Sequence, residues 1–233
     1  FMLSNPPYGK SWASEQKYIK DGSDVVDPRF IVKLKDYWGN EESCDATPRS
    51  SDGQLLFLME MVNKMKSPEH NGIGGRIASV HNGSSLFTGD AGGGESNIRR
   101  YIIENDLLNA IVQLPNNLFY NTGITTYIWL LSNNKPQQRK GKVQLIDASL
   151  MLRKLRKNLG NKNCEFAPEH IAEIMQTYLA GQDVERQLDG QNDPVGIASK
   201  VFDNQDFGYY KVNIERPDRR SAQFSAERVQ AYA

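Results

Sequence analysis

The sequence predicts an α/β fold in which helices pack on the faces of one sheet. Short apolar or β-branched runs alternate with segments of helical periodicity, proline and glycine separate them, and the later strands follow one another too closely for a crossover helix. The predicted strands are residues 1–4, 76–81, 108–114, 125–131 and 142–147. The predicted helices are residues 54–66, 96–104 and 168–179.

The first strand, Phe1 to Ser4, is a short apolar run that ends at Asn5-Pro6-Pro7. Proline cannot donate a ladder hydrogen bond, so the strand stops there. Residues 9–53 are polar with few periodic apolar positions, and we predict a long ordered loop with one short helix. Because the sequence starts inside a strand, we also expect the chain to be part of a longer one.

The helices have recognisable starts and stops. Gln54 to Lys66 is apolar nearly all round, which indicates a buried helix, and Asp52 is placed to cap it. Ser96 fits the N-cap position of a helix that continues to about Glu104. Pro168 opens a third helix through Leu179, and Gly181 ends it.

Two later strands are expected to pair antiparallel. Pro115 closes the strand 108–114, and the residues between it and the strand 125–131 are too few for a crossover helix. Lys142 to Asp147 adds one more short strand.

The formal net charge is zero, with 28 Lys and Arg against 28 Asp and Glu. A protein that binds DNA alone through many phosphates is usually basic, so other segments or subunits would have to supply much of the attraction. Basic residues do cluster locally, since residues 135–162 hold nine Lys and Arg against one Asp. That segment is either a track for a DNA backbone, or a solvated face or subunit contact.

Other features exclude several classes. Cys44 and Cys164 lie far apart and fit a reducing, cytoplasmic compartment better than a disulfide framework. No run reaches the roughly 20 apolar residues that cross a bilayer, so no membrane association is expected. The histidines lack metal-ligand spacing, no metal is expected, and we interpret His81 as structural. The glycines at 92–94 are interpreted as a flexible linker.

The tetrapeptide Asn5-Pro6-Pro7-Tyr8 follows a strand, where open α/β sheets place their ligands. Methylating an exocyclic amine is difficult because its lone pair is delocalised into the ring. The Asn5 side-chain oxygen and the Pro6 carbonyl can accept from the two amine hydrogens, Pro7 stiffens the turn, and Tyr8 offers a face for stacking on a flipped base. The alternative is a proline turn with a buried tyrosine.

Further stretches accompany this motif, and their order and spacing are informative over roughly residues 1–180. They are Leu3–Gly9, Asp52–Leu58, Gly75–Val80, Asn97–Asn105, Leu114–Ile124, Leu130–Lys135 and Val143–Ser149, with Phe207–Asn213 as a looser match. With them the chain resembles the modification subunit of type I restriction–modification systems, a family of N6-adenine DNA methyltransferases. Residues 114–124 are the most specific part of the resemblance.

The resemblance implies a partial Rossmann-like, S-adenosylmethionine-dependent methyltransferase sheet with an antiparallel final pair, followed by a helical C-terminal segment. It implies that residues 1–150 form the catalytic, amine-binding half of the methyltransferase domain and that residues 151–233 form an extension, a candidate subunit contact. It carries over Asn5, Pro6, Pro7 and Tyr8 as catalytic residues. It also places Phe119, Asn121 and Thr122 in a loop near the flipped adenine; the alternative for Phe119 is a core position.

The implied partners are DNA and the specificity and restriction subunits of a type I complex, with the specificity subunit docking after Ala148. In the family, a glycine-containing donor motif and a large helical domain precede the proline motif. The cofactor-binding residues are therefore expected upstream of Phe1, and this chain alone is expected to be inactive. Two other functions stay open: a non-catalytic scaffold, and an amine methyltransferase that acts on RNA or on protein glutamine.

Overall fold

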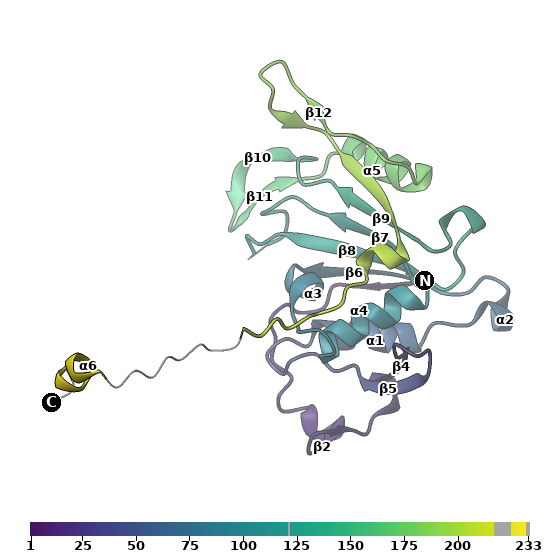
Figure 1. Cartoon of the computed structure of the whole chain (residues 1–233). Helices are drawn as coiled ribbons and strands as arrows, with labels where there is room; N and C mark the ends of the chain where they lie inside the picture. Colours follow the sequence, from purple (N-terminus) through teal and green to yellow (C-terminus); the bar gives the residue numbers. More distant parts are fainter. Residues whose placement is uncertain (121, 217–224, 232–233) are drawn as a thin grey trace.

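The computed structural model describes residues 1–120, 122–216 and 225–231, and its centre is a six-stranded sheet of order β1-β6-β8-β7-β9-β14 (Figure 1). Its strands are β1 (Met2–Ser4), β6 (Arg76–Asn82), β7 (Leu108–Gln113), β8 (Thr126–Ser132), β9 (Lys142–Asp147) and β14 (Ala198–Asp203). β1 is parallel to β6, and β7 is parallel to β9, whereas β8 is antiparallel to both of its neighbours. The predicted antiparallel pair is confirmed.

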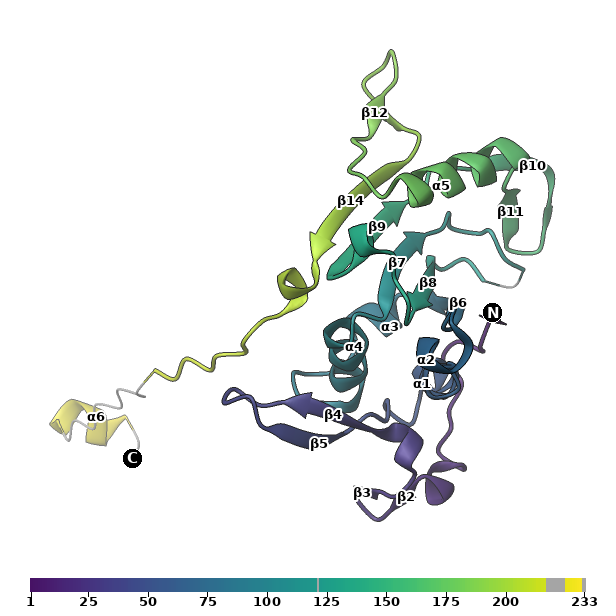
Figure 2. The ribbon, with the colours of Figure 1, turned by 90° about the vertical axis from the view of Figure 1, so that its right-hand side faces the viewer.

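Helices cover both faces of this sheet, which confirms the predicted α/β class. Helices α1 (Gln54–Asn63) and α4 (Gly94–Glu104) lie on one face, and α5 (Pro168–Ala180) lies on the other (Figure 2). The shorter helices are α2 (Pro68–Asn71), α3 (Ser84–Phe87) and α6 (Ala226–Gln230), with 3₁₀ turns η1 (Gln16–Tyr18), η2 (Pro28–Phe30), η3 (Gln137–Arg139) and η4 (Asn204–Phe207). None of the helices in the described residues combines the length and apolarity that a bilayer crossing needs.

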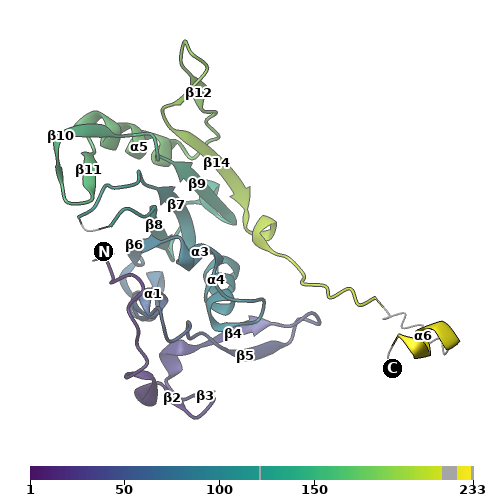
Figure 3. The same ribbon diagram turned by 90° about the vertical axis from the view of Figure 1, so that its left-hand side faces the viewer.

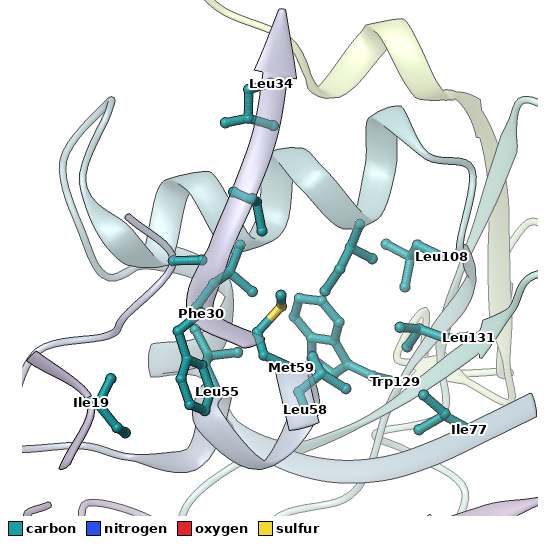
Figure 4. Packing of buried hydrophobic residues seen from close by; sticks show 14 of the residues in the cluster. Ile19, Phe30, Leu34, Leu55, Leu58, Met59, Ile77, Leu108, Trp129 and Leu131 are labelled. Atoms are coloured by element: carbon teal, nitrogen blue, oxygen red, sulfur yellow. The ribbon is translucent and has the colours of Figure 1, made fainter. Parts of the chain in front are cut away.

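The hydrophobic core consists of two clusters, one on each face of the sheet, because successive side chains of a strand point to opposite faces. On β8, Trp129 and Leu131 belong to the cluster beneath α1 and α4, while Ile128 packs against the cluster beneath α5. Figure 4 shows Trp129 beside Leu58 and Met59 of α1 in the first cluster. Both faces of β8 are therefore covered, as its nearly continuous apolar sequence requires.

Residues 9–53 differ from the predicted single loop. They form two hairpins, β2 (Lys20–Asp21) with β3 (Asp24–Val25), and β4 (Ile31–Lys35) with β5 (Glu41–Asp45). Val32 and Leu34 are buried and belong to the first core cluster, while Lys33 between them is exposed. Figure 3 shows β4 and β5 beyond α4, on its side away from the sheet. The prediction was wrong because two buried positions suffice to fix a short strand in a polar segment.

The helix starts also differ in detail. Helix α4 begins at Gly94 with Gly93 as its N-cap, so the Ser96 cap was wrong. A Cβ at Gly94 would collide with the carbonyl oxygen of Thr47, so a close backbone approach fixes this glycine, and the linker interpretation was wrong as well. Gly53 is the N-cap residue of α1, although Asp52 Oδ1 accepts a hydrogen bond from the Gln54 amide at 3.3 Å.

Beyond residue 150 the chain adds strands as well as helices. A hairpin of β10 (Arg153–Leu159) and β11 (Lys162–Glu165) precedes α5, and a second of β12 (Gln187–Leu188) and β13 (Pro194–Val195) follows it. β14 then returns to pair antiparallel with β9, from Ala198 opposite Asp147 to Asp203 opposite Lys142. The main sheet thus takes a strand from the C-terminal segment, and a domain boundary at residue 150 stays a prediction.

Candidate active site

The Asn5–Tyr8 turn lies at one edge of the main sheet. β1, β6, β7 and β9 run in the same direction, so the loops after all four emerge at the edge drawn on the left in Figure 1. We call this the motif edge; its loops are residues 5–9, 83–88, 114–125 and 148–152. The other end of these strands is the opposite edge. Ligands of open α/β sheets bind outside the carboxyl ends of strands, so the motif edge is the expected position for a site.

The turn presents Asn5 to solvent. Asn5 and Pro7 are exposed, Pro6 is buried and Tyr8 is half-buried. The Tyr8 hydroxyl donates to Asn5 Oδ1 at 2.6 Å. Burial raises the pKa of Tyr8, so the hydroxyl stays protonated and remains a donor at neutral pH. A carbonyl oxygen has two lone pairs, so Asn5 Oδ1 can still accept a second hydrogen bond.

A polar network lies directly behind this turn. The Gly9 amide donates to Asp52 Oδ1 at 3.3 Å. Gln54 Nε2 lies 2.7 Å from Asp52 Oδ2, 2.7 Å from Asn82 Oδ1 and 2.8 Å from Ser84 Oγ. Asp52 and Gln54 are buried. The network therefore joins the end of the motif to the start of α1 and to the loop after β6.

His81 closes the network from the sheet side. Its Nδ1 lies 3.1 Å from Gln54 Oε1, an acceptor that also receives the Asn82 amide at 3.2 Å. Nδ1 must therefore carry the proton, and Nε2 is left without a hydrogen-bond partner in the described part of the chain. Burial lowers the pKa of His81 to about 4, against a smaller raising effect of Asp52. The ring is neutral at pH 7, in keeping with its interpretation as structural.

This network is not predicted by the sequence. Asp52 is expected only as a helix cap, and the sequence predicts no role for Gln54, Asn82 or Ser84. The available signal was local: small polar residues flank a glycine at Asp52-Gly53-Gln54 and again at Asn82-Gly83-Ser84. They come together because α1 packs against β6, which lies next to β1 in the sheet.

The second predicted group lies in the loop between β7 and β8. Phe119 is half-buried and packs against the second core cluster, while the next residue, Tyr120, is 63% exposed. Thr122 accepts a long hydrogen bond of 3.5 Å from the Ile124 amide. Asn121 lies outside the described residues. β6 and β8 separate β7 from β1, so the axes of β1 and β7 are roughly 14 Å apart at ordinary strand spacing.

The described residues near Asn5 do not form a pocket for a nucleoside-sized donor by themselves. A cavity of about 220 Å³ is lined by Asn109, Arg139, Lys142 and Gln144 and lies towards the opposite edge. A second, of about 10 Å³, is lined by residues that include Asp52, Gln54 and Ser84 and has the size of a water molecule. Neither cavity in the described part of the chain therefore fits a nucleoside-sized donor next to Asn5.

Metal and thiol chemistry receive no support from the described residues. Within residues 1–120, 122–216 and 225–231, no three His, Cys, Asp or Glu side chains converge as a metal site would require. Cys44 and Cys164 are free thiols, and burial raises the pKa of each, so neither is an activated nucleophile.

The family model that matches this chain and two of its curated relatives are all named as methylases. Residues 1–201 match the family model described as N-6 DNA Methylase. The chain is 30% identical over 208 residues to the type I restriction enzyme HindI methylase subunit of Haemophilus influenzae, covering 83% of this chain and 42% of that protein. It is 26% identical over 178 residues to the type I restriction enzyme MjaIX methylase subunit of Methanocaldococcus jannaschii, covering 76% of this chain and 27% of that protein.

The fold has a solved counterpart. The type I restriction-modification methyltransferase subunit of Streptococcus thermophilus superposes with a TM-score of 0.61 at 24% identity, over 87% of this chain and 34% of that one. The chain therefore spans less than half the length of these relatives. Since the family model covers most of its residues and the sheet agrees with a solved methyltransferase subunit, this chain belongs to the N-6 DNA methylase family.

Proposed function

We propose that this chain is the amine-binding part of a DNA methyltransferase that transfers a methyl group from S-adenosylmethionine to N6 of adenine. We also propose that it works as the modification subunit of a type I restriction–modification complex. The observation that carries the proposal is the exposed Asn5, oriented by Tyr8, in a double-proline turn at the carboxyl end of β1. Family membership and the names of the relatives support it.

The chemistry follows from the turn. The adenine amine is planar because its lone pair enters the ring. Asn5 Oδ1 and the Pro6 carbonyl accept one amine hydrogen each, which draws the nitrogen towards a tetrahedral shape and frees its lone pair. S-adenosylmethionine, when bound, would supply the electrophilic methyl group and leave as S-adenosylhomocysteine, and the methylated nitrogen would then lose one hydrogen as a proton. The same two oxygens stabilise the positive charge that develops on the nitrogen, and the prolines keep them in place beforehand.

The substrate contacts are part of the same proposal. An adenine inside a duplex is out of reach, so it must rotate out of the stack before it reaches Asn5. Tyr8 stacks on its face, and the loop with Phe119, Asn121 and Thr122 bounds the other side. The exposed ring of Tyr120 is an additional aromatic surface in that loop. The spacing of roughly 14 Å between the axes of β1 and β7 leaves room for a base between the loops that follow them.

The chain spans only 42% of the length of the HindI methylase subunit and 27% of that of the MjaIX methylase subunit. Its partners therefore belong to the proposed function. We propose that a separate part of the protein binds the donor, that a specificity subunit selects the DNA sequence and that a restriction subunit completes the complex. We also propose a cytoplasmic location, which suits an enzyme that acts on cellular DNA and a chain with two free thiols.

The test replaces Asn5 in the full-length protein, assembled with its partner subunits, and measures transfer of a labelled methyl group to duplex DNA. Asn5→Ala removes one of two preorganised acceptors, and the expected loss in kcat is roughly 10²–10³-fold. The matched control is Asn63→Ala. Asn63 is exposed, is the last residue of α1, and lies outside the motif.

Full DNA methylation by the Asn5→Ala protein would contradict the proposal. So would a full-length protein that methylates RNA or protein glutamine and leaves DNA adenine unmodified. Equal losses in Asn5→Ala and Asn63→Ala would assign the effect to general damage instead of to the acceptor.

A further inference from the structure

We propose that the hairpin of residues 153–165, which we call the basic hairpin, binds the phosphate backbone of the DNA duplex beside the flipped base. This inference rests on the proposed function and adds to it a surface for the same substrate. β9 places the basic hairpin at the motif edge, because the hairpin begins six residues after the carboxyl end of that strand. Figure 1 shows β10 and β11 on the same side as the motif-edge loops.

Three cations of the basic hairpin are free to bind an anion. Lys154, Arg156 and Lys157 are exposed, and none of them makes an ion pair or side-chain hydrogen bond with any described residue. The other two basic side chains are engaged. Arg153 pairs with Glu165, the one acid of the hairpin, at 2.7 Å, and Lys162 points inward.

The basic hairpin is joined to the loop that is proposed to contact the base. Lys162 Nζ donates to the Leu118 carbonyl at 2.7 Å, and the Asn163 amide donates to the Asn117 carbonyl at 3.1 Å. The buried Cys164 thiol lies 3.2 Å from the Asn116 carbonyl. Figure 2 and Figure 3 show the hairpin alongside this loop from two sides. A phosphate bound by the hairpin would therefore lie next to residues 116–120.

The charge distribution favours DNA over a purely solvated face. The chain is neutral overall, so attraction to a polyanion must come from a local patch. The outward-facing side of the β4–β5 hairpin offers a contrast, because its exposed Lys33 pairs with Glu41 at 3.4 Å, and Glu42 adjoins that pair. In the basic hairpin the free charges have one sign, which is the pattern that phosphate contacts need.

The experiment measures DNA binding by the full-length protein with a fluorescent duplex that contains one unpaired adenine, at several salt concentrations. The variant carries Lys154→Gln, Arg156→Gln and Lys157→Gln. The matched control carries Lys66→Gln, Lys140→Gln and Lys142→Gln. These three exposed residues also lack ion pairs among the described residues. Lys140 and Lys142 belong to the basic segment 135–162, but they precede or begin β9 and so lie, like Lys66, at the opposite edge, away from the basic hairpin. Both variants remove three positive charges.

The basic-hairpin variant is expected to bind at least about tenfold more weakly at low salt, and its slope of log K against log salt falls by about 2–3, because each lost phosphate contact removes about 0.9. The control variant should keep most of the DNA affinity at low salt and most of the salt dependence. Thermal unfolding should be unchanged in the two proteins, since all six side chains are exposed.

Three results would overturn the inference. One is equal weakening in the two variants, which would indicate only net charge. Another is an unmodified full-length protein that shows no DNA binding even at low salt. The third is unchanged DNA binding together with lost association with the specificity subunit, which would make the hairpin a subunit contact. The proposed function is judged separately, because Asn5→Ala should lower methylation roughly 10²–10³-fold and leave DNA binding by the hairpin intact.

Discussion

The two edges of the main sheet connect their loops in different ways. At the opposite edge the connection is a charge pair: Lys135 Nζ lies 2.6 Å from Asp106 Oδ1, and the Lys135 side chain is 1% exposed. Gly141 and Asn204 also donate to Asp106, so one carboxylate joins the loops around β7, β8, β9 and β14. At the motif edge the centre is the neutral amide of Gln54, and the turn it supports keeps Asn5 exposed.

Polar groups at the opposite edge contribute to stability, whereas those at the motif edge leave the Asn5 side chain accessible. At the opposite edge the polar atoms of Lys135 and Asp106 are used to join strands. At the motif edge the network stays behind the turn, reaches it through the Gly9 amide, and leaves Asn5 with a free lone pair. We therefore expect substitutions at the opposite edge to change the free energy of unfolding, and substitutions in the turn to change methylation.

The largest effect on stability is expected for Lys135→Met. Burial would raise the pKa of Asp106, but hydrogen bonds from Lys135, Gly141 and Asn204 outweigh it and lower that pKa. Removing the cation leaves the carboxylate without its charge partner, and the expected cost is about 3 kcal/mol in the free energy of unfolding. Urea unfolding measures this change in the free energy of unfolding. The control is Arg153→Met, which breaks the exposed Arg153–Glu165 pair and is expected to cost less than about 1 kcal/mol. Similar costs for the two variants would remove the contrast between a buried and an exposed pair.

His81 should make stability depend on pH in a defined window. Its pKa is about 4 in the folded chain and about 6.5 when unfolded, so the unfolded state binds the proton first as the pH falls. The contribution of His81 is complete above pH 6.5 and is lost towards pH 4, with about 2.5 kcal/mol gone at pH 4.5. Unfolding measured at pH 7.5 and 4.5 tests this against His81→Gln, in which the pH dependence should be smaller by that amount. Identical pH dependence in the two proteins would show that His81 can be protonated without cost.

The smallest effect on stability is expected for Tyr8→Phe, which removes the hydrogen bond to the exposed Asn5 and keeps the aromatic face. The free energy of unfolding should change by less than about 0.5 kcal/mol, while kcat falls about tenfold because the Asn5 amide is no longer oriented. KM for DNA should hardly change. Full activity in Tyr8→Phe together with a large loss in Tyr8→Leu would assign Tyr8 to stacking alone.

The sequence predicts the sheet well because its signals are local. β6, β7, β8 and β9 are short apolar or β-branched runs with proline or glycine near their ends, and the short connection between β7 and β8 leaves only antiparallel pairing. The hairpin β4–β5 was missed although Ile31-Val32-Lys33-Leu34-Lys35 alternates as a strand does. The residues around it are polar, so an alternation with only two buried positions was not enough to predict a strand from the sequence.

The motif turn is predictable for the same reason, since its four residues are consecutive. The network behind it is not, because Gly9, Asp52, Gln54, Asn82 and Ser84 come together only when β1, α1 and β6 are packed. The start of α4 was missed on similar grounds: Gly94 is required by Thr47, which lies far away along the chain. Long-range contacts of this kind leave no periodic pattern in a single sequence.

We propose that the turn after β1 presents two oxygens to the adenine amine. A structure of the full-length protein with a DNA duplex and an unreactive donor analogue would test this position of the base. We expect an adenine outside the stack with N6 about 3 Å from both Asn5 Oδ1 and the Pro6 carbonyl oxygen. An extruded adenine whose amine faces another part of the protein, with Asn5 still bound only to Tyr8, would contradict it.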